Sequence, residues 1–227
     1  MTRYNYDRLS AQDNAFLLFE NPSQHMHVTS TQVFDLGPLE TDGAGVDYES
    51  IKRFTASVLF RIRRYRQRLK WIPLENSPVW VDDRDFDITY HIRRSALPSP
   101  GSDAQLHDLV ARLGSRPLDR SRPLWEMYLV EGLAKNRVAI YTKSHQALVN
   151  GMTALEIDHV IADRTQKPPE FGEDIWIPGR EPSDRQLIIG ALGEWITRPT
   201  AQAAAVRTTM GTSKPLASAS ALATAAA

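Results

Sequence analysis

A histidine stands where a strand pattern gives way to a helix pattern. Residues 137–143 read R-V-A-I-Y-T-K, and their alternation of side chains predicts a half-buried strand. Residues 144–151 read S-H-Q-A-L-V-N-G, and apolar residues then recur at helical spacing over 152–161. His145 is therefore expected at a strand-to-helix turn, with Asn150 as the helix N-cap. The positive end of the helix dipole would keep the imidazole neutral, as a general base requires.

The segments around this histidine resemble a known family. K-S-H-Q-A-L-V-N-G (143–151) follows P-L-W-E-M-Y-L-V-E-G-L (123–133). Both resemble the bacterial wax ester synthase/diacylglycerol acyltransferase family, whose motif is H-H-x-x-x-D-G. Further similarity lies in L-S-A-Q-D-N-A-F-L-L-F-E-N (9–21), H-M-H-V (25–28) and S-R-P-L-D-R-S-R-P-L-W-E (115–126). The resemblance implies an acyl-CoA-dependent O-acyltransferase, related more distantly to chloramphenicol acetyltransferase and the carnitine acyltransferases.

The motif itself departs from the family pattern. His145 takes the place of the first histidine, Gln146 of the second, Asn150 of the aspartate and Gly151 of the glycine. In the wider superfamily the second histidine is the base. Glutamine has no basic nitrogen. Loss of a general base typically costs ~10²–10⁴ in rate, which is roughly 3–5 kcal/mol of barrier.

Each motif position has a chemical and a structural interpretation. His145 would serve as a substitute base if its ring reached the substrate hydroxyl, although a lone histidine on a turn is usually structural. Gln146 would donate a hydrogen bond to the thioester carbonyl and polarise it. Asn150 would orient a neighbour or cap the helix, and Gly151 would allow a tight backbone.

Two functions follow as hypotheses. In the first, acyl-CoA is a co-substrate, no cofactor is needed, and an acyl group passes to diacylglycerol or a long-chain alcohol, giving triacylglycerol or wax ester. In the second, the chain is a catalytically inactive half-domain that binds acyl-CoA, lipid or a partner chain. Family members resemble one another over about twice this length, with substrate channels between two halves, so a C-terminal half-domain is an expected partner.

The composition of the chain limits which classes of protein and which kinds of site are expected. The 227 residues hold 27 basic and 27 acidic side chains, so nothing indicates a nucleic-acid-binding protein. The chain has no cysteine, which excludes disulfides and thiolate metal sites. His25 and His27 lack an obvious third ligand, so no metal site is expected. The N-terminus lacks a signal-peptide h-region. A cytoplasmic location is expected, either free or in peripheral contact with a membrane or lipid droplet.

The surrounding segments predict an α/β fold, a two-layer sandwich with a mixed sheet, which is also what the resemblance to chloramphenicol acetyltransferase implies. Helices are expected from Ser10 and from Ser102, where Gln105 completes a capping box. Strands are expected over 27–36, 79–81, 88–93, 125–131 and 137–143, the last two as a hairpin. The acid-rich stretch 82–87 is interpreted as a solvated turn.

A longer amphipathic helix is predicted from Asp47, with an apolar face that extends to Leu69. Eight Lys or Arg and no acid lie between Ile51 and Lys70. They are interpreted as a solvated face, or alternatively as a surface that attracts anionic lipid or the phosphates of coenzyme A.

The chain is expected to divide into three parts. Residues 1–165 form an acyltransferase-like N-terminal domain, and 166–200 form a proline-marked connection with a helix over 186–196. Residues 201–227 contain eleven alanines and two charges, which indicates a linker or disordered tail.

Overall fold

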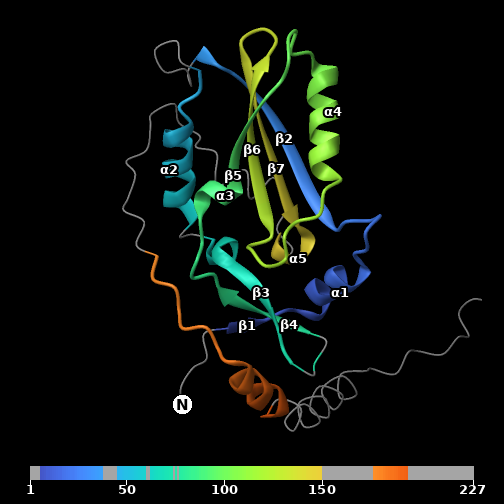
Figure 1. The fold of residues 1–227 in the computed structure, drawn as a ribbon, viewed down its shortest axis with the longest axis vertical. Helices are drawn as coiled ribbons and strands as arrows, with labels where there is room; N and C mark the ends of the chain where they lie inside the picture. The colour runs from blue at the N-terminus through green and yellow to red at the C-terminus, as the bar shows by residue number, and fades with distance from the viewer. Residues whose placement is uncertain are drawn as a thin grey trace, which may run out of the picture. The chain divides into compact units, whose positions relative to one another are not determined.

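The computed structural model describes residues 6–37, 45–59, 62–73, 75, 77–149 and 176–193. The chain divides into two compact units, 1–182 and 183–227. The described helices and strands of the first unit are β1 (Tyr6–Arg8), α1 (Ala11–Phe19), β2 (His27–Asp35), α2 (Tyr48–Val58), η3 (Arg63–Arg66), β3 (Gln67–Trp71), β4 (Pro78–Asp82), α3 (Ile88–His91), β5 (Ile92–Ala96), α4 (Asp103–Gly114), β6 (Trp125–Leu133), β7 (Arg137–His145) and α5 (Gln146–Val149), as Figure 1 shows.

The larger sheet is mixed and places the predicted site at one strand end. Its order is β2-β7-β6-β5, with β5 parallel to β6 and the other pairs antiparallel. The predicted β6–β7 hairpin is confirmed, and its turn places Lys135 and Asn136 at positive φ. In the β2–β7 register His27 lies directly opposite His145. Two histidines far apart in the sequence are thus cross-strand neighbours.

Helices cover both faces of this sheet (Figure 1). On one face, Ala139 and Tyr141 of β7 pack with Leu106 and Leu113 of α4. On the other face, Val138 belongs to a cluster against which Ile51 of α2 packs. Because strand side chains alternate between faces, His145 lies on the α4 face with Ala139 and Tyr141. The predicted capping box of α4 is present, with Ser102 and Gln105 as partners.

A second, three-stranded sheet has the order β1-β4-β3 and is antiparallel. The largest apolar cluster joins it to α1 and α5. This cluster includes Leu17, Leu69, Trp80, Trp125 and Leu148. An α/β fold with a mixed sheet is therefore confirmed. The core reaches the strand end that carries His145.

The predicted long basic helix was wrong. Helix α2 ends at Val58, and the chain continues through η3 into β3, which pairs with β4. Q-R-L-K-W alternates buried and less buried residues, so the sheet period applies from Gln67 onward. Arg66 is 1% exposed and donates a hydrogen bond to the Ala56 carbonyl. The apolar spacing across 51–69 therefore comes from two elements, a helix and a strand, and not from one helix.

Several basic residues of this stretch are paired with acids. Arg63 forms a 2.9 Å ion pair with Asp82, and Arg68 and Lys70 each lie 2.9 Å from Glu181.

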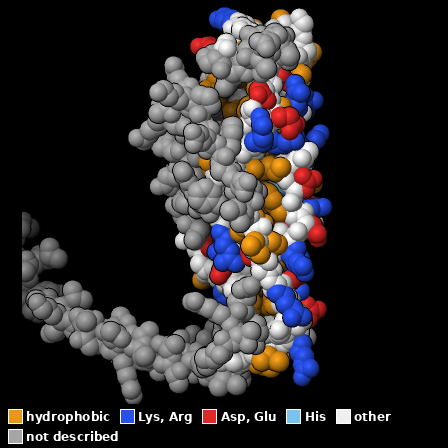
Figure 2. Space-filling model, turned by 90° about the vertical axis from the view of Figure 1, so that its left-hand side faces the viewer, with side chains coloured by type: hydrophobic (Ala, Val, Ile, Leu, Met, Phe, Trp, Pro, Cys, Tyr) orange, Lys and Arg blue, Asp and Glu red, His pale blue; other side chains and the backbone are white. Residues whose placement is uncertain are grey.

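The predicted solvated turn at 82–87 was also wrong at its start, because Asp82 and Asp83 are each 4% exposed. Figure 2 shows basic and acidic side chains interspersed with hydrophobic ones on one face of the described surface.

Two other boundaries differ from prediction. Residues 88–93 were expected to be extended, but Ile88–His91 form a helical turn capped by Asp87, which accepts from the Thr89 N–H. Strand β5 then begins at Ile92. In the second unit a helix spans 184–193, and Ser183 and Gln186 exchange hydrogen bonds at its N-terminus. The rest of the predicted 186–196 helix lies outside the described residues. None of the helices in the described ranges is long and apolar enough to cross a membrane.

Candidate active site

The strand-to-helix turn predicted around His145 is present. Strand β7 ends at His145 and α5 begins at Gln146. The His145 N–H donates to the Leu124 carbonyl at 3.0 Å, and the Gln146 N–H donates to the Met26 carbonyl at 2.8 Å. The turn is therefore fixed to the segments that precede β6 and β2.

Two of the four predicted site residues are not covered. Asn150 and Gly151 lie outside the described residues, so the predicted N-cap stays a prediction. Helix α5 starts four residues before Asn150, earlier than the apolar periodicity of 152–161 indicated. Leu148 and Val149 are buried in the largest apolar cluster, which anchors the turn.

Both ring nitrogens of His145 face protein groups. The ring is 1% exposed, and its Nδ1 accepts a 3.0 Å hydrogen bond from the Ala147 N–H. In a neutral ring the proton is then on Nε2, which lies 3.4 Å from Oε2 of Glu20. Burial is the largest cause that lowers the pKa of His145, and Glu20 opposes it. The lowered pKa favours a neutral ring, and the lone pair on Nδ1 is occupied by the Ala147 N–H.

Gln146 is the neighbouring residue and its side chain is half-buried. It occupies the position of the second histidine in the family motif. An amide at this position donates and accepts hydrogen bonds but does not take up a proton near neutral pH. The turn therefore offers a polar contact where a base is expected.

Glu20 was missed by the sequence reasoning. It follows α1, and its Oε2 accepts a 2.6 Å hydrogen bond from Arg120 while facing His145. Burial raises the pKa of Glu20, but the hydrogen bond and charge of Arg120, together with the nearby imidazole of His145, outweigh it, so the pKa is lowered. Glu20 is an anion that ties α1 to the end of β7.

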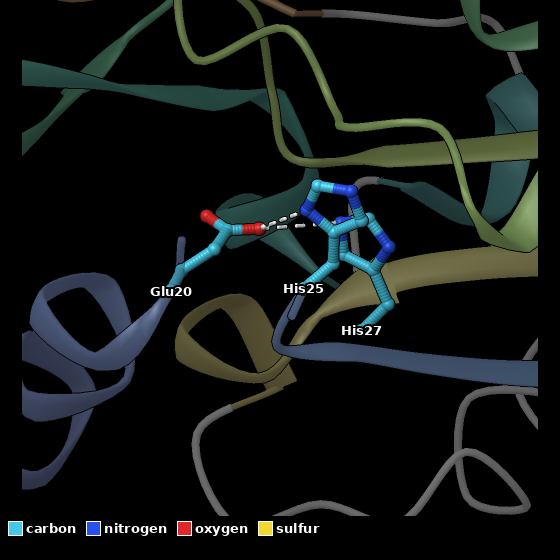
Figure 3. A group of neighbouring side chains, drawn as sticks. All are labelled: Glu20, His25 and His27. Carbon is cyan, nitrogen blue, oxygen red and sulfur yellow. Dashed lines mark ion pairs between the residues drawn. The ribbon is translucent and has the colours of Figure 1, made fainter. Parts of the chain in front are cut away.

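His25 and His27 face the other oxygen of the same carboxylate (Figure 3). His25 Nδ1 lies 3.4 Å and His27 Nε2 3.6 Å from Glu20 Oε1. The two rings stack with centroids 5.0 Å apart. Burial lowers the pKa of His27 to about 4. The third potential ligand that the sequence reasoning lacked is therefore Glu20, whose position five residues before His25 was a usable signal.

A buried ammonium lies two residues before His145 on the same face of β7. Lys143 is 1% exposed and donates to the carbonyls of Leu113 and Arg116 at 3.0 and 3.1 Å. Its Nζ lies 3.3 Å from Glu126, and burial is the largest cause that lowers the Lys143 pKa. These contacts connect β7 to the C-terminal end of α4, so the Lys143 ammonium has a structural role.

A cavity of ≈ 240 Å³ lies on the α5 side of the turn. It is lined by Asp7, Ile62, Arg63, Arg64, Tyr65, Gln67, Leu148 and Val149. Arg63 pairs with Asp82, and Arg64 lies 3.6 Å from Asp7. The lining thus combines apolar side chains with arginines that already have acidic partners.

Comparison with known proteins identifies the chain. The wax ester synthase/diacylglycerol acyltransferase catalytic domain matches residues 9–227. The chain belongs to this family of acyltransferases. Among relatives, "Probable diacyglycerol O-acyltransferase tgs3" of Mycobacterium tuberculosis is 58% identical over 200 residues, which is 88% of this chain and 72% of that protein. "Probable diacyglycerol O-acyltransferase tgs2" of the same organism is 38% identical over 197 residues, covering 82% of this chain and 41% of that protein.

Solved structures agree with the family assignment. The wax ester synthase/diacylglycerol acyltransferase from Marinobacter aquaeolei VT8 is 35% identical with a TM-score of 0.53, over 66% of this chain and 37% of that chain. The starter condensation domain of rhizomide synthetase RzmA is 13% identical with a TM-score of 0.52, over 69% of this chain and 38% of that chain, which shows a shared fold alone. The chain thus spans less than half of both solved proteins.

Proposed function

We propose that this wax ester synthase/diacylglycerol acyltransferase family member transfers a fatty acyl group from acyl-CoA to diacylglycerol or a long-chain alcohol at the turn between β7 and α5. The observation that carries the proposal is this turn, which presents Gln146 where the family motif has its second histidine. The products are triacylglycerol or wax ester, together with free coenzyme A.

In this reaction the acceptor hydroxyl oxygen attacks the thioester carbonyl carbon. The new C–O ester bond forms, the C–S bond breaks, and the hydroxyl proton ends on the departing thiolate. A base normally carries that proton. Gln146 instead donates its amide N–H to the thioester oxygen and stabilises the developing negative charge.

His145 supports the turn in this proposal. Its Nδ1 already accepts from the Ala147 N–H, and its Nε2 faces Glu20. The substitute-base role predicted for His145 would require both contacts to break. We therefore assign the proposed chemistry to Gln146, with Asn150 and Gly151 kept as predicted supporting positions. Transfer without a general base is expected to be slower by ~10²–10⁴ than with one.

A second candidate is acyl-CoA or lipid binding without turnover. The occupied lone pair of His145 favours it, as does the amide at Gln146. In this case the 1–165 domain, with 166–200 as connection and 201–227 as linker, would work with a partner half-domain. This second candidate includes peripheral contact of the chain with a membrane or lipid-droplet surface.

Release of coenzyme A by the purified chain separates the two candidates. With palmitoyl-CoA and diacylglycerol, the transferase proposal expects thiol release that depends on the acceptor and yields triacylglycerol; hexadecanol tests wax ester formation. A melting temperature raised by palmitoyl-CoA, with thiol release equal to that of a protein-free control, would instead establish binding without turnover.

A further inference from the structure

We propose that Glu20, His25 and His27 form a binding site for a divalent transition-metal ion, with zinc as the favoured ion. One carboxylate and two imidazoles present ligand atoms that all lie within 4.8 Å of one another. The three residues lie between the end of α1 and the start of β2, as Figure 3 shows. The observations that support this site do not rest on the acyl-transfer proposal.

The hydrogen bond of His25 determines which nitrogen carries its proton. Its Nε2 lies 3.1 Å from the Ser115 carbonyl oxygen. A carbonyl only accepts, so Nε2 is the N–H donor. In the neutral ring the lone pair is then on Nδ1, which faces Glu20 at 3.4 Å. This buried Nδ1 has no hydrogen-bond partner among the described residues.

His27 repeats the arrangement with its nitrogens exchanged. Its Nδ1 lies 3.4 Å from the Gly114 carbonyl oxygen, so Nδ1 is the donor and Nε2 carries the lone pair. Nε2 is also buried and lacks a hydrogen-bond partner within the described ranges. A metal-binding histidine usually donates its other N–H to a carbonyl or carboxylate in this way, because that contact fixes the tautomer. The carbonyls at the end of α4 orient both rings.

The two oxygens of Glu20 have different neighbours. Oε2 faces the donors of Arg120, at 2.6 Å, and His145, at 3.4 Å. Oε1 faces the lone pairs of His25 and His27. Three electron-rich atoms this close together repel one another unless a cation or a proton lies among them. The half of the carboxylate that faces the histidines is therefore the half available to a metal.

Two of the three separations between ligand atoms suit a small ion. Zinc bonds of about 2.0–2.1 Å in a tetrahedral site place neighbouring ligand atoms about 3.3 Å apart. Glu20 Oε1 lies 3.4 and 3.6 Å from the two imidazole nitrogens. Imidazole and carboxylate together suit zinc better than magnesium or calcium, which prefer oxygen ligands. Three protein ligands leave a fourth position for water or another small ligand.

Metal binding would also reach the turn between β7 and α5. His145 contacts the same carboxylate through Oε2, so it lies in the outer shell of the proposed site. Fixing Glu20 through a metal would fix the ring orientation of His145.

The test is direct titration of the full chain with zinc. After treatment with EDTA and its removal, the protein competes with a chromophoric chelator for Zn²⁺. We expect one tightly bound equivalent per chain, weakened at least ~10-fold by either His25→Gln or His27→Gln. Co²⁺ in place of zinc should give a visible absorption band that both variants lose.

The matched control is His107→Gln, since His107 is exposed on α4 and remote in sequence from the site. It should bind zinc with wild-type affinity. Circular dichroism of each variant shows whether the fold is retained. No stoichiometric zinc binding by the folded parent would overturn the proposal, as would equal affinities of the parent and folded His25→Gln or His27→Gln. Neither result would decide whether the chain transfers acyl groups, which the release of coenzyme A tests separately.

Discussion

The backbone N–H of Ala147 donates a 3.0 Å hydrogen bond to Nδ1 of His145, two residues earlier in the chain. This contact closes the turn between β7 and α5 and directs Nε2 toward Glu20, 3.4 Å away. A ring held in this way resembles a structural support more than a base that exchanges protons with substrate.

Replacement of His145 tests this role. His145→Ala removes a buried ring and leaves the Ala147 N–H without its acceptor, so we expect a loss of about 2–4 kcal/mol in the free energy of unfolding. His145→Asn keeps an acceptor oxygen near the Nδ1 position and should lose less. Urea denaturation measures both. Equal stability of His145→Ala and the parent would show that the ring does not support the turn.

The ion pair between Arg63 and Asp82 is expected to contribute more to the stability of the fold than an exposed ion pair does. Asp82 is 4% exposed and also accepts from Gln67 and from the Gly179 N–H. Asp82→Ala leaves these donors unpaired and should cost about 3–5 kcal/mol in the free energy of unfolding.

Asp103→Ala is the matched control for this change, because Asp103 pairs with Arg137 at 2.7 Å while its side chain is 65% exposed. Its loss should stay under about 1 kcal/mol. Similar losses for both aspartates in chemical denaturation would contradict the assignment of Asp82 to a buried network.

His91 should make stability depend on pH. Burial lowers the pKa of His91 to about 4, although its ring lies 2.8 Å from the Trp125 carbonyl. Because the unfolded chain binds this proton near pH 6.5, stability falls as pH drops from about 6.5 toward 4. The His91 contribution between pH 7 and pH 5 is a loss of about 2 kcal/mol.

Urea denaturation at pH 7 and pH 5 checks this. His91→Gln cannot titrate in this range, so its loss between the two pH values should be about 2 kcal/mol smaller than that of the parent. The comparison within each protein removes any effect of the substitution on packing. The same pH dependence in both proteins would show that His91 is not the source.

Local patterns predicted the elements around the site. Alternation over 137–143 predicted β7, the Ser102–Gln105 pair predicted the start of α4, and the flanking motifs indicated the family that the chain is now shown to belong to. The strand and helix signals involve neighbours in sequence, so residue spacing suffices for them, whereas the family was indicated by resemblance of the motifs.

Contacts between distant segments could not be read in the same way. The apolar period of α2 ran on into β3, and the turn η3 and the pairing of β3 with β4 distinguish the two elements. His27 meets His145 because β2 pairs with β7, a register that the sequence alone does not specify. A neutral His145 was predicted from the helix dipole, whereas burial is the largest cause of its lowered pKa.

The measurement that bears most directly on the proposed chemistry is coenzyme A release from palmitoyl-CoA with diacylglycerol, compared between the parent chain and Gln146→His. Restoring an imidazole at this position supplies a base, so we expect a rate increase approaching ~10²–10⁴. Gln146→Asn changes the same position without adding a base and should be no faster than the parent. A parent rate that Gln146→His leaves unchanged would contradict the account, because a base at residue 146 would then contribute nothing to acyl transfer.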